Sequence, residues 1–342
     1  MIWLTWRQHR AQALVGAIVL ISLSTTLIII GNMARHAARQ YGLPDCSATG
    51  GDCSEALGRL HQHFHWLPPV TATFVALPLL AAMLWAAPLL SREYEAGTHR
   101  LAWTQSVSPL RWITTKIVVI CSVATLAALA LGLLVAWALA PLTPAFGTRF
   151  NSTWFDIQGV VPAACMLFAL AGGIAVSAVV RRTIPAIAIA LVLFAAVRFP
   201  VHFVRSHLAP TAVRTVSYPL AGLLPNIDSD HAMAAESGGA DANDWVLGTS
   251  RLGPDGREIG NLNNRGVIIN YCPSLPARAA ITRADKQACL PRLQGLFGRE
   301  VTIYQPASHF WRIQAVEALA FAGLGALLAA VAVLAVTRRR PA

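Results

Sequence analysis

Six long apolar stretches constrain the fold of this chain more than any other feature. Each is close to the 20 helical residues that cross a hydrocarbon core. Of the 342 residues, 55% are hydrophobic and only 13% are charged, which is unusual for a water-soluble domain. The chain is therefore predicted to be an all-α polytopic membrane protein, with an amphipathic helix over residues 1–12 ahead of the first span. The stretches are Ala13–Asn32, Val70–Leu90, Ile117–Leu139, Val160–Val180, Ile184–Val204 and Ile313–Val336.

Basic residues near the span ends predict the orientation, because they are retained on the cytoplasmic side. With the N-terminus inside, the inner segments hold eleven Lys and Arg residues and the short outer loops hold four: Arg35, Arg39, Arg59 and Arg149. Both termini are thus expected in the cytoplasm, with the chain multi-pass in the cell membrane. The net charge of +11 follows largely from this topology, and its scatter over span ends argues against nucleic-acid binding.

Six cysteines fit the same topology. Cys46 and Cys53 fall in the first outer loop and Cys272 with Cys289 in the last, whereas the remaining two lie inside spans. Outer loops face an oxidising compartment, so the disulfides Cys46–Cys53 and Cys272–Cys289 are predicted. Four free thiols are the alternative.

The segment 205–310 is the largest outer segment and separates residues 1–204, with spans one to five, from the last span and tail at 311–342. It is expected to be a disulfide-stapled α/β insert, because about 100 residues with few large apolar groups make a marginal core. We predict turns over 236–266, a strand at 267–271 ("VIINY"), a helix at 281–290 with Thr282 as N-cap, and a second strand from Glu300.

Several kinds of chemistry lack their residues. The two lysines, Lys116 and Lys286, follow Thr115 and Asp285, so the chain has no Walker A motif and is not expected to be an enzyme or to hold a cofactor. The first five predicted spans contain no Asp or Glu, which disfavours an ion-coupled carrier.

The sequence "HQHFH" leaves two interpretations open. His61, His63 and His65 could hold a metal, which would suit a membrane enzyme. Interleaved aromatic residues at a span boundary favour interfacial packing instead.

A polar island, residues 91–112, separates the second and third spans and belongs to a predicted cytoplasmic loop at 91–116. Gly97 is a natural helix end and Thr98 can cap a short transverse helix. Ser108 and Pro109 then form the signature of a new helix start. Such a compact polar segment suits docking into a groove of another protein. The alternative is that Glu93 and Glu95 merely neutralise nearby arginines at the surface.

Two motifs resemble a known family. The start "WLTWRQHR" and the stretch "EYEAGTHRLAWTQSVSPLRW" followed by Lys116 look like the actinobacterial branch of the ABC-2-type permeases, the membrane subunits of ABC exporters. The resemblance implies a separate ATPase subunit that binds ATP and Mg, a second permease copy, and a coupling helix over Arg100 to Val107. The residues it marks for ATPase coupling are Glu93, Glu95, Gly97, Thr98, Arg100, Leu101, Trp103, Gln105 and Arg111.

The sequence therefore predicts a permease that exports a hydrophobic or amphipathic cargo such as a drug, peptide or lipid, because the spans carry little charge. The rival hypothesis is a membrane-anchored sensor or binding protein that acts through residues 205–310.

Overall fold

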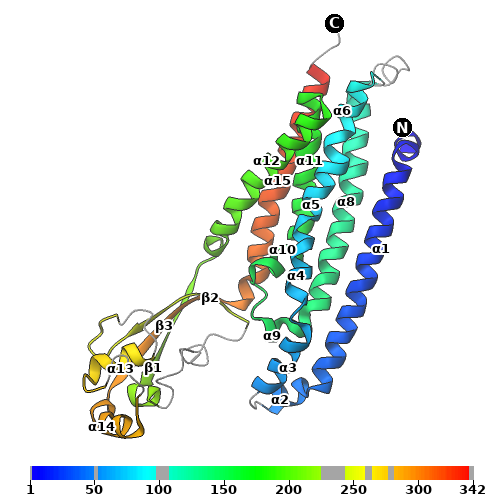
Figure 1. The fold of residues 1–342 in the computed structure, drawn as a ribbon. Coiled ribbons are helices and arrows are strands. Elements are labelled where there is room, and N and C mark those ends of the chain that lie inside the picture. The colour runs from blue at the N-terminus through cyan, green and yellow to red at the C-terminus, as the bar shows by residue number, and fades with distance from the viewer. Residues whose placement is uncertain are drawn as a thin grey trace. The chain divides into compact units, whose positions relative to one another are not determined.

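The computed structural model divides the chain into two compact units, residues 1–208 with 310–342 and residues 209–309. It describes residues 2–49, 53–97, 108–224, 243–258, 264–275 and 281–338. The first unit is a bundle of long helices that run side by side (Figure 1).

Six helical segments of the described chain are long and apolar enough to cross a membrane, as the sequence predicts. The first is α1 (Ile2–Gln40), whose first turns include the predicted amphipathic segment. The third runs through α8 (Pro109–Leu139), η3 (Ala140–Leu142) and α9 (Thr143–Phe146), and the fourth is α11 (Val161–Val180). The fifth is α12 (Thr183–Val204) with η4 (Arg205–His207), and the sixth is η7 (Ala307–His309) with α15 (Phe310–Arg338).

The second span is a chain of short helices rather than one regular helix. It consists of α4 (Leu67–Ala72), η1 (Thr73–Ala76), α5 (Leu77–Ala81), η2 (Ala82–Ala86) and α6 (Ala87–Glu95). Prolines explain the divisions, because a proline lacks the N–H that continues a helix. Pro68, Pro78 and Pro88 each lie in the first turn of one of these pieces.

Helix α11 is the centre of the bundle. Its apolar window is 72% buried, against 11–44% for the other five spans. A methyl group at Gly173 would lie 2.7 Å from Cβ of Ala86, so this glycine lets α11 approach the second span closely. The other spans leave wide apolar faces uncovered, as helices that contact lipid do.

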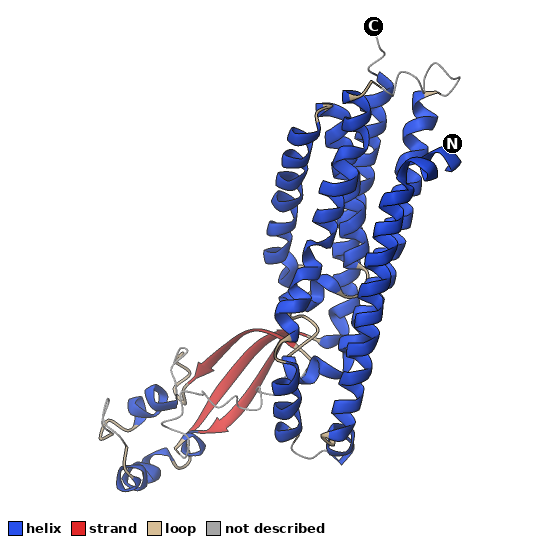
Figure 2. Ribbon diagram, turned by 45° about the vertical axis from the view of Figure 1, so that its right-hand side comes forward, coloured by secondary structure: helices blue, strands red, loops and turns tan. Residues whose placement is uncertain are grey.

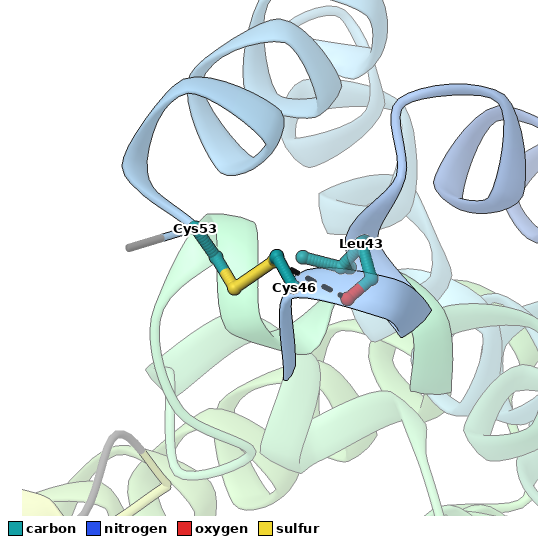
Figure 3. The surroundings of a disulfide bond; sticks show 3 residues. All are labelled: Leu43, Cys46 and Cys53. Carbon is teal, nitrogen blue, oxygen red and sulfur yellow. Dashed lines mark hydrogen bonds between the residues drawn. A yellow bond between two sulfur atoms is a disulfide. The ribbon is translucent and has the colours of Figure 1, made fainter. Parts of the chain in front are cut away.

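One end of the bundle carries the start of α1 and the ends of α6 and α15 (Figure 1). At the opposite end lie α2 (Leu43–Thr49) and α3 (Ser54–Phe64), which the Cys46–Cys53 disulfide joins with a Cα–Cα distance of 5.7 Å. Figure 3 shows the sulfur of Cys46 beside the carbonyl oxygen of Leu43, 3.4 Å away.

The connection between α9 and α11 folds back into the bundle. It contains α10 (Ser152–Ile157), which Asn151 caps by accepting a hydrogen bond from the N–H of Thr153. The N–H of Gly159 donates to the carbonyl oxygen of Gly132, inside α8, over 3.0 Å. Gly159 adopts φ +73, and a side chain there would collide with Gln314 of α15, so the position suits only glycine.

The second unit is built on a three-stranded antiparallel sheet of order β1-β3-β2 (Figure 2). The strands are β1 (Ala212–Pro219), β2 (Trp245–Leu252) and β3 (Phe297–Gln305). A small apolar core gathers η5 (Leu220–Leu223), α13 (Asn264–Tyr271) and α14 (Arg283–Leu293). The Cys272–Cys289 disulfide lies in that core, with a Cα–Cα distance of 6.0 Å.

Two predictions for this unit are confirmed and two are wrong. The capping box of Thr282 and Asp285 is present, and the strand from Glu300 lies within β3. The expected strand at 267–271 is instead part of α13, where Ile268 and Cys272, four residues apart, are both buried. The region 236–266, expected to be turns, contains β2, whose pairing partner β3 lies about 50 residues further along the chain.

Candidate functional site

The candidate site is the end of the bundle where the second span ends and the third begins. Helix α6 ends at Glu95, and Gly97 follows with φ +68, a left-handed conformation that glycine adopts without strain. The N–H of Gly97 donates to the carbonyl oxygen of Tyr94 over 3.3 Å. Thr98, Arg100, Leu101, Trp103 and Gln105 lie outside the described residues.

The third span begins as its sequence predicts. The Ser108 hydroxyl caps α8 by accepting a hydrogen bond from the N–H of Arg111 over 3.3 Å, and Pro109 occupies the first turn. Arg111 is exposed at this helix start. Gly97 and Ser108 thus bound the segment 98–107 with a helix end on one side and a helix start on the other.

Glu93 points into the bundle rather than outward. Its carboxylate forms an ion pair with the ammonium of Lys116, in α8, whose side chain is only 3% exposed. The ammonium also lies 4.5 Å from the ring centre of Trp112, a favourable cation–π arrangement. This pair ties the last turn of α6 to the third turn of α8.

Glu95 caps a different helix. Its Oε1 accepts a hydrogen bond from the N–H of Thr183 and its Oε2 one from the Thr183 hydroxyl, both over 2.8 Å. A carboxylate at this position satisfies a free N–H and complements the positive end of the dipole of α12. The hydroxyls of Thr183 and Ser91 lie 3.0 Å apart, and Ser91 is fully buried.

The turn between α11 and α12 also contacts α6. Arg181 ends α11 in a left-handed conformation with φ 57, and its guanidinium lies 5.1 Å from the ring centre of Tyr94. Below these polar contacts an apolar cluster joins α6, α8, α11 and α15. Its buried members include Leu90, Trp112, Ile113, Leu170, Ile174 and Ala332.

These contacts join the two helices that precede and follow residues 98–107 in the chain, and they add α12. We call the residues that make them the loop frame: Ser91, Glu93, Glu95, Lys116 and Thr183. The structure gives Glu93 a partner on α8 and Glu95 a partner on α12. The loop frame thus joins α6, α8 and α12, which belong to three different spans.

The sequence analysis missed the partners in this frame. A partner for Lys116 could have been expected from the sequence, because a lysine beside a long apolar stretch requires a counter-charge. The pairing of Thr183 with Glu95 could not have been expected, since a threonine after two arginines is an ordinary helix start and Glu95 is 88 residues away.

The three histidines of the first loop have separate partners. Nδ1 of His61 lies 3.1 Å from the carbonyl oxygen of Ala145, and Nδ1 of His63 lies 3.3 Å from the hydroxyl of Tyr41. Nδ1 of His65 lies 2.8 Å from the carbonyl oxygen of Gln62. No three His, Cys, Asp or Glu side chains gather as metal ligands within the ranges that the structure describes.

A family model described as "ABC-2 membrane transporter related" matches residues 17–205. The matched region includes the second, third and fourth spans, most of the first and fifth, the loop frame and the segment 98–107. No curated protein and no solved structure matches the chain.

Proposed function

Because this match covers more than half of the sequence, the chain belongs to the ABC-2 membrane transporter related family, and we propose that it is the permease subunit of an ATP-driven exporter. In this proposal a separate ATPase subunit binds ATP and Mg, and a second permease copy completes the membrane part. The chain is a multi-pass membrane component of a transporter.

The observation that carries the proposal is the loop frame. Residues 98–107 are attached on one side to α6, which Glu93 ties to α8 and Glu95 ties to α12. On the other side they lead directly into α8. A partner that pushes on this segment would move these helices together, as a coupling helix must.

Two sequence features support the division of labour. Both lysines lack the Gly-Lys-Ser/Thr context of a nucleotide-binding loop, so ATP binding falls to a partner chain. The basic residues of the termini and of residues 91–116 favour the cytoplasmic side for the segment 98–107, where an ATPase subunit would meet it.

The cargo in this proposal is hydrophobic or amphipathic, such as a drug, a peptide or a lipid. The apolar windows of the six spans carry few charges, and this suits such a molecule better than a small hydrophilic ion. Accumulation assays that found export of small ions alone would overturn this part of the proposal.

The first test is to purify the tagged chain in mild detergent from its native membrane and identify stoichiometric partners by mass spectrometry. We expect a protein with a Walker A motif, and we expect Arg100→Ala to reduce its recovery. Arg59→Ala is the matched control, because Arg59 is exposed and forms an ion pair with Glu55 of the same helix, α3, at the other end of the bundle.

Functional coupling separates this proposal from the sensor hypothesis. As a permease subunit, the chain should lose coupling between ATP hydrolysis and transport when Glu93→Ala or Arg100→Ala is introduced. As a sensor acting through residues 205–310, it should keep its function with these substitutions and lose it with changes in that segment. A chain that purifies without any ATPase would favour the sensor.

A further inference from the structure

Four charged side chains meet inside the bundle, far from the loop frame. We call them the charge cluster: Asp156 of α10, Arg198 of α12, Arg205 of η4 and Glu317 of α15. Arg205 is 2% exposed and Glu317 1%, while the side chains of Asp156 and Arg198 are 10% and 13% exposed.

The cluster is closed and electrically balanced, with two guanidinium groups facing two carboxylates. Oε1 of Glu317 accepts hydrogen bonds from Arg198 over 2.8 Å and from Arg205 over 3.1 Å, and Oε2 accepts one from Nε of Arg205 over 2.9 Å. Asp156 forms ion pairs with both arginines. Removing any one member leaves an unbalanced charge in a nearly dry site.

The cluster is largely buried and lies toward the end of the spans that is remote from the loop frame. Arg198 comes 15 residues after Thr183, which places it roughly 22 Å along α12, and Arg205 follows the last residue of that helix. Apolar residues of similar size would hold a static bundle together at least as well. Buried charge pairs can instead specify one of two arrangements of the helices that they join.

The cluster also joins a connecting segment to two spans, and it adds to the contacts that Phe155 of α10 makes with Gln314 and Phe310 of α15. Helices α12 and α15 both pack on α11, and the pairs of Arg198 and Arg205 with Glu317 connect them directly. Asp156 adds α10, a short helix of a connecting segment rather than of a span. Pro200 lies between the two arginines and removes one backbone hydrogen bond of α12, which makes this the point where α12 bends most easily.

We propose that the charge cluster is a latch that holds α10, α12 and α15 together in the resting bundle and opens during the transport cycle. This inference rests on the proposed function, since it assigns the latch to the end of the bundle opposite the ATPase. Asp156 is the member that leaves, because α10 belongs to a connecting segment rather than to a span. Its departure would also have to break the hydrogen bond that the Gln314 amide of α15 donates to the carbonyl oxygen of Phe155 over 3.0 Å.

The native Cys165 offers a probe of the latch. It is a buried free thiol of α11, the helix on which α12 and α15 both pack, and Cys121 is the other free thiol of the described chain. In a Cys121→Ala background, the rate of maleimide labelling in membranes therefore reports how often the helices around α11 separate.

The first arm compares Asp156→Asn with Asp156→Glu. Loss of the carboxylate in Asp156→Asn should raise the labelling rate of Cys165 roughly 100-fold. In Asp156→Glu, which keeps a carboxylate, the labelling rate should be close to that of the wild type. Gel filtration and intact disulfides verify that each variant is folded. Labelling of folded Asp156→Asn at the wild-type rate would refute the latch.

The second arm uses the chain with unaltered charges together with its co-purified ATPase. Trapping the complex with ATP and vanadate should accelerate labelling of Cys165 relative to the nucleotide-free complex. Equal rates in the two states would show that the cluster is static and overturn the proposal even if the first arm succeeds. Absence of any ATPase would refute the proposed function instead, and the first arm would still decide whether the cluster holds α10.

Discussion

We predict that replacing Glu93 costs more stability than replacing Lys116, because the two members of this ion pair differ in burial. Glu93→Gln leaves the ammonium of Lys116, 3% exposed, without its carboxylate. Breaking a buried pair in this way costs about 3 kcal/mol. Lys116→Met leaves the Glu93 side chain, 19% exposed, which water can reach, and the cost falls to about 1 kcal/mol.

The double variant should be more stable than Glu93→Gln alone. Glutamine and methionine leave no unpaired charge, and methionine can still pack on Trp112, so the double variant should lie within about 1 kcal/mol of wild type. Independent effects would instead sum to about 4 kcal/mol. This difference is the coupling energy between α6 and α8.

Apparent melting temperatures in detergent, followed by fluorescence-detected gel filtration, measure these differences. At about 2 °C per kcal/mol for a chain of this size, Glu93→Gln should lower the midpoint by about 6 °C and Lys116→Met by about 2 °C. An additive double variant, or a larger loss for Lys116→Met than for Glu93→Gln, would refute the assignment of this pair as a buried tie.

Two further predictions concern the second unit. Replacing Cys272 and Cys289 with serine should destabilise it by about 3 kcal/mol through lost loop constraint, seen as faster proteolysis within 209–309 while the helical bundle stays resistant. Hydrogen bonds from the Thr282 hydroxyl and N–H lower the pKa of Asp285 below its ordinary 3.8. The stability that this cap contributes is therefore complete above the pKa of Asp285 in the unfolded chain and is lost as pH falls through its pKa in the folded chain. Hydrogen exchange of residues 283–293 should accelerate on acidification. The control variant Asp285→Asn should lack this transition.

The sequence predicts best where one physical requirement dominates. A helix that crosses a bilayer needs about 20 apolar residues, and each of the six predicted spans overlaps an observed one, with bounds that differ by up to eight residues. The capping box of Thr282 and Asp285 could be predicted equally well, because its two partners are three residues apart.

Prediction fails where distant partners decide the outcome. The β-branched run at 267–271 favours a strand locally, but the buried positions Ile268 and Cys272 and the bond to Cys289 select a helix. The same reason hides the loop frame and the charge cluster. The partners of Glu95 and Glu317 lie 88 and more than 100 residues away in the chain, and no local pattern identifies them.

Both polar constellations of the bundle meet in α12. Glu95 holds its first residue, Thr183, and the charge cluster holds its far end through Arg198 and Arg205. A helix of 22 residues spans about 33 Å, and its ladder of hydrogen bonds makes it stiff up to Pro200, where one bond is missing. If the proposed function is correct, a displacement of residues 98–107 would therefore move α12 as a stiff rod and shift Arg198 and Arg205 at its other end. The helix can bend there, at Pro200. Loss of the Asp156 carboxylate from the charge cluster would then leave the remaining three charges unbalanced.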